Sequence, residues 1–148
     1  MAIQVYNDHL EVSDKDFDKL RDLVTEAKSL SYCPYSKFRV ASCVLTESGD
    51  FITGVNVENA SYGAGICAER AAISRAVSQG HRKFRAIAIA ADTPKPIVPC
   101  GICRQFMREF NEDIVLFLFS KESDHIKVYL KDLLPLSFGP EDLGIEIK

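Results

Sequence analysis

Three cysteines and one glutamate have the types and spacing that metal-assisted chemistry requires. Cys67 is followed two residues later by Glu69, and Cys100 and Cys103 lie three residues apart. Residues three apart share one face of a helix, so these two thiolates can bind the same ion. Cys67 opens a predicted helix, and the dipole at a helix N-terminus stabilises a thiolate. Three thiolates with an open fourth position are typical of catalytic rather than structural Zn²⁺.

The residues that follow Cys67 have separate expected roles. A carboxylate two residues from a metal ligand, such as Glu69, reaches metal-bound water without ligating the metal and can move its proton. Three thiolates and a hydroxide give a zinc site a net charge of about −2, which weakens the metal as a Lewis acid. An arginine that donates to sulfur offsets this charge. Arg70 and Arg104 are both candidates, and we favour Arg70 because it lies closest to Cys67 and Glu69.

Other uses of the cysteines fit their positions less well. Cys100 and Cys103 form a Cys-x-x-Cys pattern, and residues 33–36 resemble a monothiol redox motif. Thioredoxin-like folds place such motifs directly after an early strand, which neither segment follows. A structural zinc site needs a fourth ligand, and His81 lies beyond the end of the helix that Cys67 opens. We expect Cys33 and the fifth cysteine, Cys43, to be small apolar residues in or near the core.

The first half of the chain predicts one helix and a β-hairpin. Ser13 is a candidate N-cap, and the apolar stripe that follows it has helical spacing, which predicts a helix over about Asp14–Leu30. Two β-rich runs, Phe38–Thr46 and Phe51–Val57, flank a turn that contains glycine. The polar segment Glu58–Gly65 is a predicted loop.

The second half alternates helices and strands. We predict helices at Cys67–Gln79 and Gly101–Phe110, a short helical turn at 132–135, and strands at Phe84–Ala91, Ile114–Phe119 and Ile126–Leu130. The run 84–91 is continuously apolar and suits a strand that is covered on both faces. Helices between successive strands imply crossovers, so the element order predicts an α/β fold with a mixed sheet and helices on both faces.

Length and composition indicate one domain, residues 1–148, with residues 1–12 as a loosely ordered lead-in. The charge of 18 − 21 = −3 lacks the basic footprint of a nucleic-acid-binding protein. No apolar run has the length of a membrane span, and the first residues do not resemble a secretion signal. An odd count of five cysteines favours reduced thiols and a cytoplasmic location over disulfides.

Four ordered motifs together carry a family resemblance. The chain resembles the short, homotetrameric, zinc-dependent cytidine deaminases from about Tyr32 to about Leu143, and it contains the Cys-x-Glu and Pro-Cys-x-x-Cys signature of zinc deaminases. The motifs are Asn56–Tyr62, Ile66–Arg70, Pro99–Gln105 and Leu133–Pro140. The resemblance implies a three-layer α/β/α sandwich around a five-stranded sheet.

The resemblance also implies the reaction and the catalytic groups. Cys67, Cys100 and Cys103 would hold one Zn²⁺ per subunit and an activated water that attacks C4 of cytosine. Glu69 would deliver the proton of that water to N3 of the ring and then assist the departure of ammonia. Cytidine and 2′-deoxycytidine would thereby become uridine and 2′-deoxyuridine, a step of pyrimidine salvage.

Further residues would bind the nucleoside. By resemblance, Asn56 and Glu58 would hold ribose hydroxyls, Phe38 would pack beside the base, and the backbone N–H of Ala68 would face the reacting atoms. Phe138 would stack on the base, and Tyr62 would approach the sugar, each in the site of a neighbouring subunit. Considered without the resemblance, Asn56 and Glu58 are equally well explained as polar turn residues, and Phe138 as a core anchor.

Three further hypotheses compete with the interpretation as a cytidine deaminase. They are a deaminase for another aminopyrimidine such as blasticidin S, an inert zinc-stabilised interaction module, and an editor of cytosine in polynucleotides. The tail around Phe138, with Asn56 and Glu58, favours a free nucleoside. The acidic balance disfavours polynucleotides, and an intact Glu69 disfavours an inert module.

Overall fold

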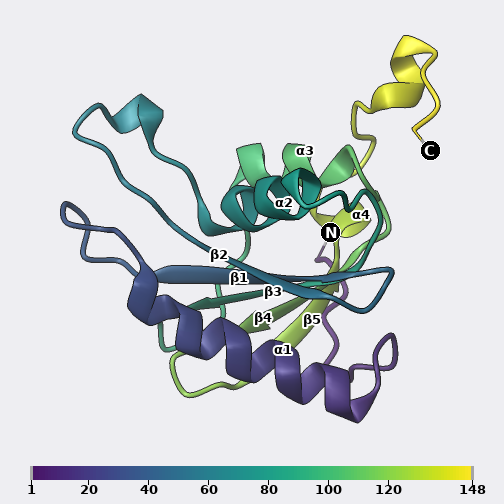
Figure 1. Ribbon diagram of the computed structural model, residues 1–148. Coiled ribbons are helices and arrows are strands. Elements are labelled where there is room, and N and C mark those ends of the chain that lie inside the picture. Colours follow the sequence, from purple (N-terminus) through teal and green to yellow (C-terminus); the bar gives the residue numbers. More distant parts are fainter. Residues whose placement is uncertain (1, 148) are drawn as a thin grey trace.

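A five-stranded sheet lies between two layers of helices in the computed structural model, which describes residues 2–147 (Figure 1). Met1 and Lys148, the ends of the expected domain, lie outside the described residues. The strands are β1 (Val40–Thr46), β2 (Phe51–Val55), β3 (Phe84–Ala91), β4 (Val115–Phe119) and β5 (His125–Tyr129). The helices are α1 (Asp14–Ala27), α2 (Ala68–Ser78), α3 (Gly101–Arg108) and α4 (Leu130–Leu133). Short 3₁₀ helices lie at Lys28–Leu30, Tyr62–Ala64 and Pro140–Leu143.

The sheet has the order β2-β1-β3-β4-β5. Strands β3 and β4 are parallel and are joined through α3, whereas the other neighbouring pairs are antiparallel. Helix α1 covers one face of the sheet, and α2, α3 and α4 cover the other (Figure 1). The predicted three-layer sandwich with a mixed five-stranded sheet is therefore confirmed.

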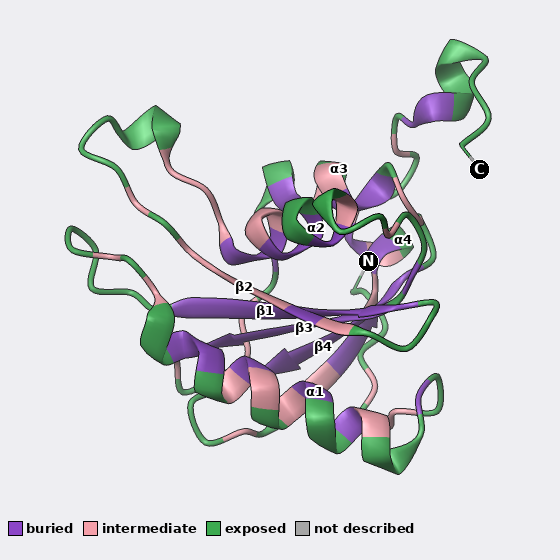
Figure 2. Cartoon of the chain, viewed as in Figure 1, coloured by how far each residue is buried: buried purple, intermediate pink, exposed green. Residues whose placement is uncertain are grey.

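Helix α1 forms where its cap and its apolar stripe predict it. The Ser13 hydroxyl accepts a hydrogen bond from the Asp16 N–H at 3.1 Å, which satisfies a free donor at the helix N-terminus. Phe17, Leu20 and Val24 are buried against the sheet, and Figure 2 shows this buried face of the helix beneath the strands. None of the helices in residues 2–147 has the length and apolar character needed to cross a membrane.

Strand β1 begins at Val40 instead of the predicted Phe38. Lys37 adopts a left-handed backbone conformation with φ 59°, which ends regular extended geometry just before Phe38. The Phe38 carbonyl and the Val40 N–H then bond to the side chain of Asn56 rather than to a strand backbone, at 2.7 and 3.1 Å. The other boundaries lie within three residues of the predictions.

The N-terminal segment contacts the outer edge of β5. Tyr6 exchanges two backbone hydrogen bonds with Lys127, at 2.9 and 2.7 Å. The Lys127 side chain is 2% exposed and forms ion pairs with Asp8 and Glu11. These pairings stabilise a buried ammonium that would otherwise carry a large desolvation cost.

Gly54 on β2 brings α2 unusually close to the sheet. A Cβ at this position would lie 2.3 Å from the Ala72 nitrogen, 2.7 Å from its Cα and 2.9 Å from the Ala68 carbonyl oxygen. All three are backbone atoms, which cannot move aside independently. The missing side chain therefore sets the distance between β2 and the helix that begins after Cys67.

Replacement of Gly54 by alanine should destabilise the fold. Because the added methyl group overlaps the α2 backbone, we expect the free energy of unfolding to fall by roughly 1–3 kcal/mol, measured by urea denaturation. Gly63→Ala is the matched control, since a Cβ there meets no atom within 4 Å. Equal stability of the two variants would contradict the close approach of α2 to β2.

Candidate metal centre and substrate pocket

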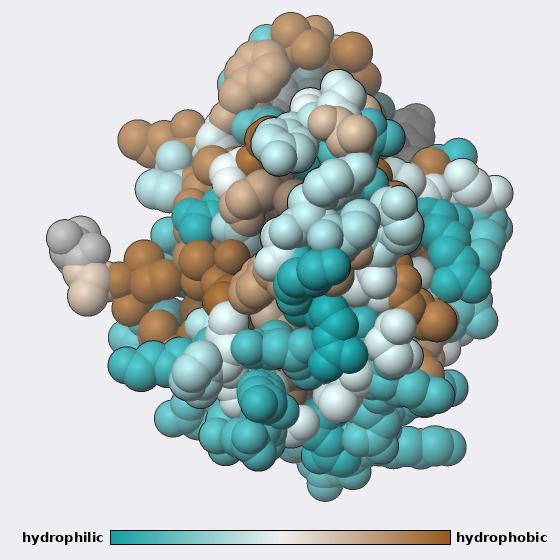
Figure 3. Space-filling model, turned by 90° about the vertical axis from the view of Figure 1, so that its left-hand side faces the viewer, coloured by the Kyte–Doolittle hydropathy of each residue, from teal (hydrophilic) through white to brown (hydrophobic). Residues whose placement is uncertain are grey.

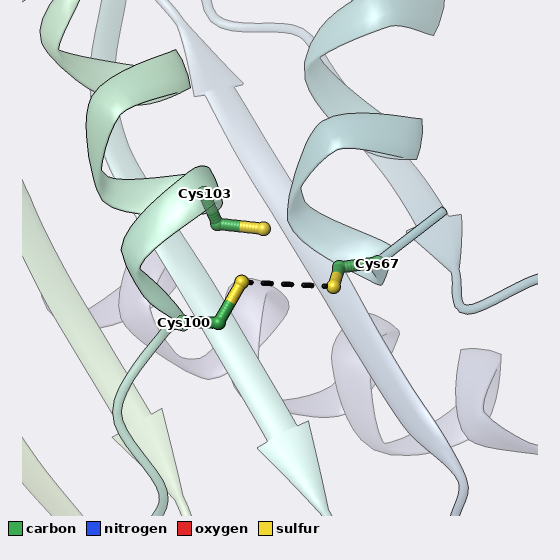
Figure 4. Close-up of side chains that lie close together, drawn as sticks. All are labelled: Cys67, Cys100 and Cys103. Atoms are coloured by element: carbon green, nitrogen blue, oxygen red, sulfur yellow. Dashed lines mark hydrogen bonds between the residues drawn. The ribbon is translucent and has the colours of Figure 1, made fainter. Parts of the chain in front are cut away.

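Two helix N-termini bring three cysteine sulfurs together. Cys67 is the N-cap of α2, Cys100 is the N-cap of α3, and Cys103 lies in the first turn of α3. Figure 4 shows the three sulfurs pointing toward a common centre between the helices. Their Sγ atoms all lie within 4.8 Å of one another, and those of Cys67 and Cys100 are 3.8 Å apart.

This cluster fits Zn²⁺ in both chemistry and spacing. Tetrahedral zinc with Zn–S bonds of about 2.3 Å places its sulfurs about 3.8 Å apart. Among residues 2–147, the group of side chains that could bind this ion consists of the three thiols alone. His81 follows the opposite end of α2, where its Nε2 lies 3.6 Å from an Asp50 carboxylate oxygen. The donor set therefore matches three-thiolate zinc with a fourth position available to a non-protein ligand.

The three thiols differ in their acidity. Burial raises the pKa of Cys67 and Cys103, and the negative charge of Glu69 raises both further. Burial also acts to raise the pKa of Cys100, but hydrogen bonding to backbone at the start of α3 and to the other two thiols outweighs it, so this pKa is lowered. The helix N-terminus thus favours the thiolate of Cys100. A divalent cation would supply the charge that favours the other two thiolates.

Arg70 is the arginine that contacts the cluster. Its Nη2 donates to the Cys67 sulfur at 3.6 Å, while its Nε is buried and has no hydrogen-bond partner among the described residues. Arg104 lies elsewhere: it donates to the Pro99 carbonyl at 2.8 Å and to the Leu133 carbonyl at 2.9 Å. The structure therefore places Arg70, the favoured candidate, beside the Cys67 sulfur. Arg104 instead connects the start of α3 to the end of α4.

Glu69 lies in the first turn of α2 and is 4% exposed. Burial raises the pKa of this carboxyl above its ordinary value, while an interaction with Cys103 and the positive charge of Arg70 act in the opposite direction. A carboxyl with a raised pKa exchanges protons more readily near neutral pH than a solvated glutamate does.

The cluster forms part of the wall of a pocket of about 520 Å³, a volume typical of small-molecule sites. The site residues predicted from the sequence that line it are Phe38, Asn56, Glu58, Tyr62, Cys67, Ala68, Glu69, Arg70 and Cys100. The pocket therefore combines a thiol-rich region at the helix N-termini with aromatic and polar groups from the loops before β1 and after β2. Cys103 is fully buried behind this surface.

The two candidate sugar-binding residues are already held by the protein. The Asn56 amide bonds to the Phe38 carbonyl and accepts from the Val40 N–H. The Glu58 carboxylate accepts hydrogen bonds from the N–H groups of Tyr35 and Ser36, at 3.1 and 3.0 Å, and from the Ser36 hydroxyl. Sequence reasoning did not single out Ser36 as a site residue, because its partner lies 22 positions away.

Phe138 lies outside this pocket, on a tail that α3 anchors. The Phe138 carbonyl accepts a hydrogen bond from Gln105 Nε2 at 2.9 Å. Arg108, which is buried, donates to the Ser137 hydroxyl at 2.6 Å and forms an ion pair with Glu141. The Phe138 side chain itself is 58% exposed, and the tail stands away from the body of the molecule in Figure 2. Within this chain, Phe138 and the cysteine cluster are thus not brought together.

Comparison with known proteins agrees with this arrangement. Residues 14–118 match the family described as the cytidine and deoxycytidylate deaminase zinc-binding region. A probable cytidine deaminase of Dictyostelium discoideum is 41% identical over 89% of this chain and 90% of its own length. A cytidine deaminase of Halalkalibacterium halodurans is 43% identical over 80% of this chain and 91% of its own length.

Solved structures show the same likeness. The crystal structure of cytidine deaminase from Burkholderia pseudomallei has a TM-score of 0.79 and 40% identity, covering 82% of this chain and 98% of the other. The matched family segment contains the three clustered cysteines and Glu69. On these grounds, the chain belongs to the zinc-binding cytidine and deoxycytidylate deaminase family.

Proposed function

We propose that this protein is an enzyme that hydrolyses cytidine and 2′-deoxycytidine to uridine and 2′-deoxyuridine with release of ammonia, as in pyrimidine salvage. The observation that carries the proposal is the convergence of three thiols and a buried glutamate beside a pocket of about 520 Å³. This combination places an acid–base group, a metal-binding group and room for a nucleoside within one site.

Zn²⁺ is the cofactor, held by Cys67, Cys100 and Cys103. When bound, the metal supplies Lewis acidity that makes water nucleophilic near neutral pH. Glu69 takes one proton from the attacking water and delivers it to N3 of the pyrimidine ring. It then moves the remaining proton of that oxygen to the amino group on C4, which leaves as ammonia. Arg70 donates to the Cys67 sulfur and thereby offsets part of the negative charge of three thiolates.

The remaining pocket residues orient the nucleoside. Phe38 packs beside the base, while Asn56 and Glu58 hold sugar hydroxyls through carboxamide and carboxylate groups. The backbone N–H of Ala68 faces the reacting part of the ring. Burial of the apolar face of the base and pairing of the sugar hydroxyls together fix C4 against the cysteine cluster.

We propose that the active form is a cytoplasmic homotetramer whose sites are completed by neighbouring subunits. The exposed Phe138 ring, anchored on α3 but outside the pocket of its own chain, supports this arrangement. The exposure of Tyr62, on the loop between β2 and α2, also supports a contact with a neighbouring subunit. The five free thiols support a reducing compartment.

Loss of one cysteine should remove the metal. We expect Cys100→Ser to purify with much less than one zinc per subunit, because serine is a poor ligand for this soft site. Cys33→Ser is the matched control and should retain zinc, since Cys33 lies outside the cluster. Elemental analysis measures both. Full zinc loading of Cys100→Ser would contradict the ligand assignment.

The affinity for zinc should weaken as the pH falls. Cys67 and Cys103 have raised pKa values without the metal, so binding of zinc displaces their protons.

Removal of the Glu69 carboxyl should abolish turnover while preserving zinc. We expect Glu69→Ala to lower kcat by at least about 10²–10⁴-fold, because it removes the general acid–base group.

The substrate is tested on the unaltered protein. Ammonia release is measured with cytidine, 2′-deoxycytidine, cytosine, CMP and blasticidin S, alongside zinc content. Turnover of the two nucleosides by the unaltered protein is the expected pattern. Activity on none of the five compounds by zinc-loaded protein would overturn the proposed function.

Loss of the Phe138 ring should impair a neighbouring site. We expect Phe138→Ala to raise KM for cytidine by about tenfold, since a stacked aromatic ring contributes roughly 1–3 kcal/mol. In tetramers mixed from Phe138→Ala and Glu69→Ala subunits, some sites should combine Glu69 of one subunit with Phe138 of its neighbour. These sites should recover activity. Sedimentation of the unaltered protein tests the tetramer directly. A fully active monomer, or mixed tetramers without recovered activity, would refute completion by neighbours.

A further inference from the structure

The Ser36 hydroxyl forms the middle of a short hydrogen-bond chain at the edge of the pocket. Its oxygen accepts a hydrogen bond from the Phe38 N–H at 3.0 Å, and its own O–H donates to Glu58 Oε2. The Phe38 N–H therefore occupies an acceptor position on the hydroxyl and helps to direct its proton toward the carboxylate. Successive hydrogen bonds of this kind strengthen one another.

The same loop saturates one oxygen of the Glu58 carboxylate. Oε1 accepts from the N–H groups of both Tyr35 and Ser36, and Oε2 accepts from the Ser36 hydroxyl. A carboxylate has about four acceptor positions, two on each oxygen. One acceptor position on Oε2 is thus left for a ligand. These donors also hold the pKa of Glu58 below its ordinary value, led by the Ser36 hydroxyl.

Glu58 lies between two hollows of the surface. It lines the pocket of about 520 Å³ that contains the cysteine cluster, and also an adjoining pocket of about 400 Å³ that Tyr35 and Ser36 line. The adjoining residue Lys37 has φ 59°, a conformation that costs free energy in a residue with a side chain. Figure 3 shows the side of the molecule with these loops, where apolar patches are separated by hydrophilic surface.

We propose that Ser36 is a positioning residue that orients the Glu58 carboxylate so that it accepts a hydrogen bond from a single hydroxyl of the nucleoside sugar. This inference rests on the proposed function. Ser36 does not contact the base in this arrangement. It acts through Glu58, so its effect depends on the sugar hydroxyl that Glu58 receives.

The test compares Ser36→Ala with Ser36→Thr, with Ser29→Ala, and with the same change in an E58Q background. Ser36→Thr keeps the hydroxyl, and the exposed position leaves room for the added methyl group. Ser29→Ala is the matched control, because it removes another exposed serine hydroxyl whose partner, the Glu26 carbonyl, lies on the α1 side. For each variant, kcat and KM are measured with cytidine and with 2′,3′-dideoxycytidine, with the inhibition constant of the dideoxynucleoside as a second measure.

We expect Ser36→Ala to lower kcat/KM for cytidine by about tenfold, mainly through KM, with zinc content unchanged. The dideoxynucleoside lacks both ring hydroxyls, so its values should change by less than about twofold. Ser36→Thr should restore most of the loss, and Ser36→Ala should have little further effect in an E58Q background because the two residues act as one unit.

Two outcomes would overturn the positioning role. One is a Ser36→Ala enzyme that matches Ser29→Ala on cytidine. The other is an equal loss on cytidine and on the dideoxynucleoside, which would indicate general damage to the pocket. Failure of the proposed function is distinguishable from both, since the unaltered, zinc-loaded protein would then deaminate neither nucleoside.

Discussion

The convergence of the N-termini of α2 and α3 is the constraint on which the site depends. Helix α2 runs into the start of β3, and α3 leaves its end to reach the parallel strand β4. Both helices therefore begin beside the same end of β3. Residues at the start of α2 therefore lie near residues at the start of α3. This is why Cys67 and Cys100 meet although 33 positions separate them.

This convergence concentrates groups that disfavour one another when charged. Three thiols and the Glu69 carboxyl share a small volume, and burial raises the pKa of Glu69, Cys67 and Cys103. Arg70 supplies a positive charge against the Cys67 sulfur. The close approach of α2 to β2 at Gly54 holds the helix in place. The fold thus maintains an arrangement whose electrostatics favour occupation by a divalent cation.

Local sequence patterns predicted the parts of this structure that depend on neighbouring residues. The stripe on α1, the hairpin and the two cysteine-bearing helix starts all follow from spacing and capping rules. The sequence also favoured Arg70 over Arg104, because Arg70 lies closest to both Cys67 and Glu69. The site near the helix starts was therefore largely visible in the sequence.

Contacts between distant side chains were less accessible. The bonds from Asn56 to Phe38 and Val40, which move the start of β1, replace backbone pairing with side-chain pairing. No periodicity encodes such a replacement. The hydrogen bond between Ser36 and Glu58 likewise depends on how two loops meet in space. The motifs around Asn56 and Glu58 drew attention to these residues only through the family resemblance.

The attachment of Tyr6 to Lys127 has a consequence for self-association. Strand β5 borders the sheet, and its free side offers unpaired N–H and C=O groups to any other extended chain. Tyr6 occupies both backbone groups of Lys127, in the middle of that strand. The N-terminal segment therefore blocks pairing of this edge with another chain, which opposes edge-to-edge aggregation. The ion pairs of Asp8 and Glu11 with Lys127 hold the segment against β5.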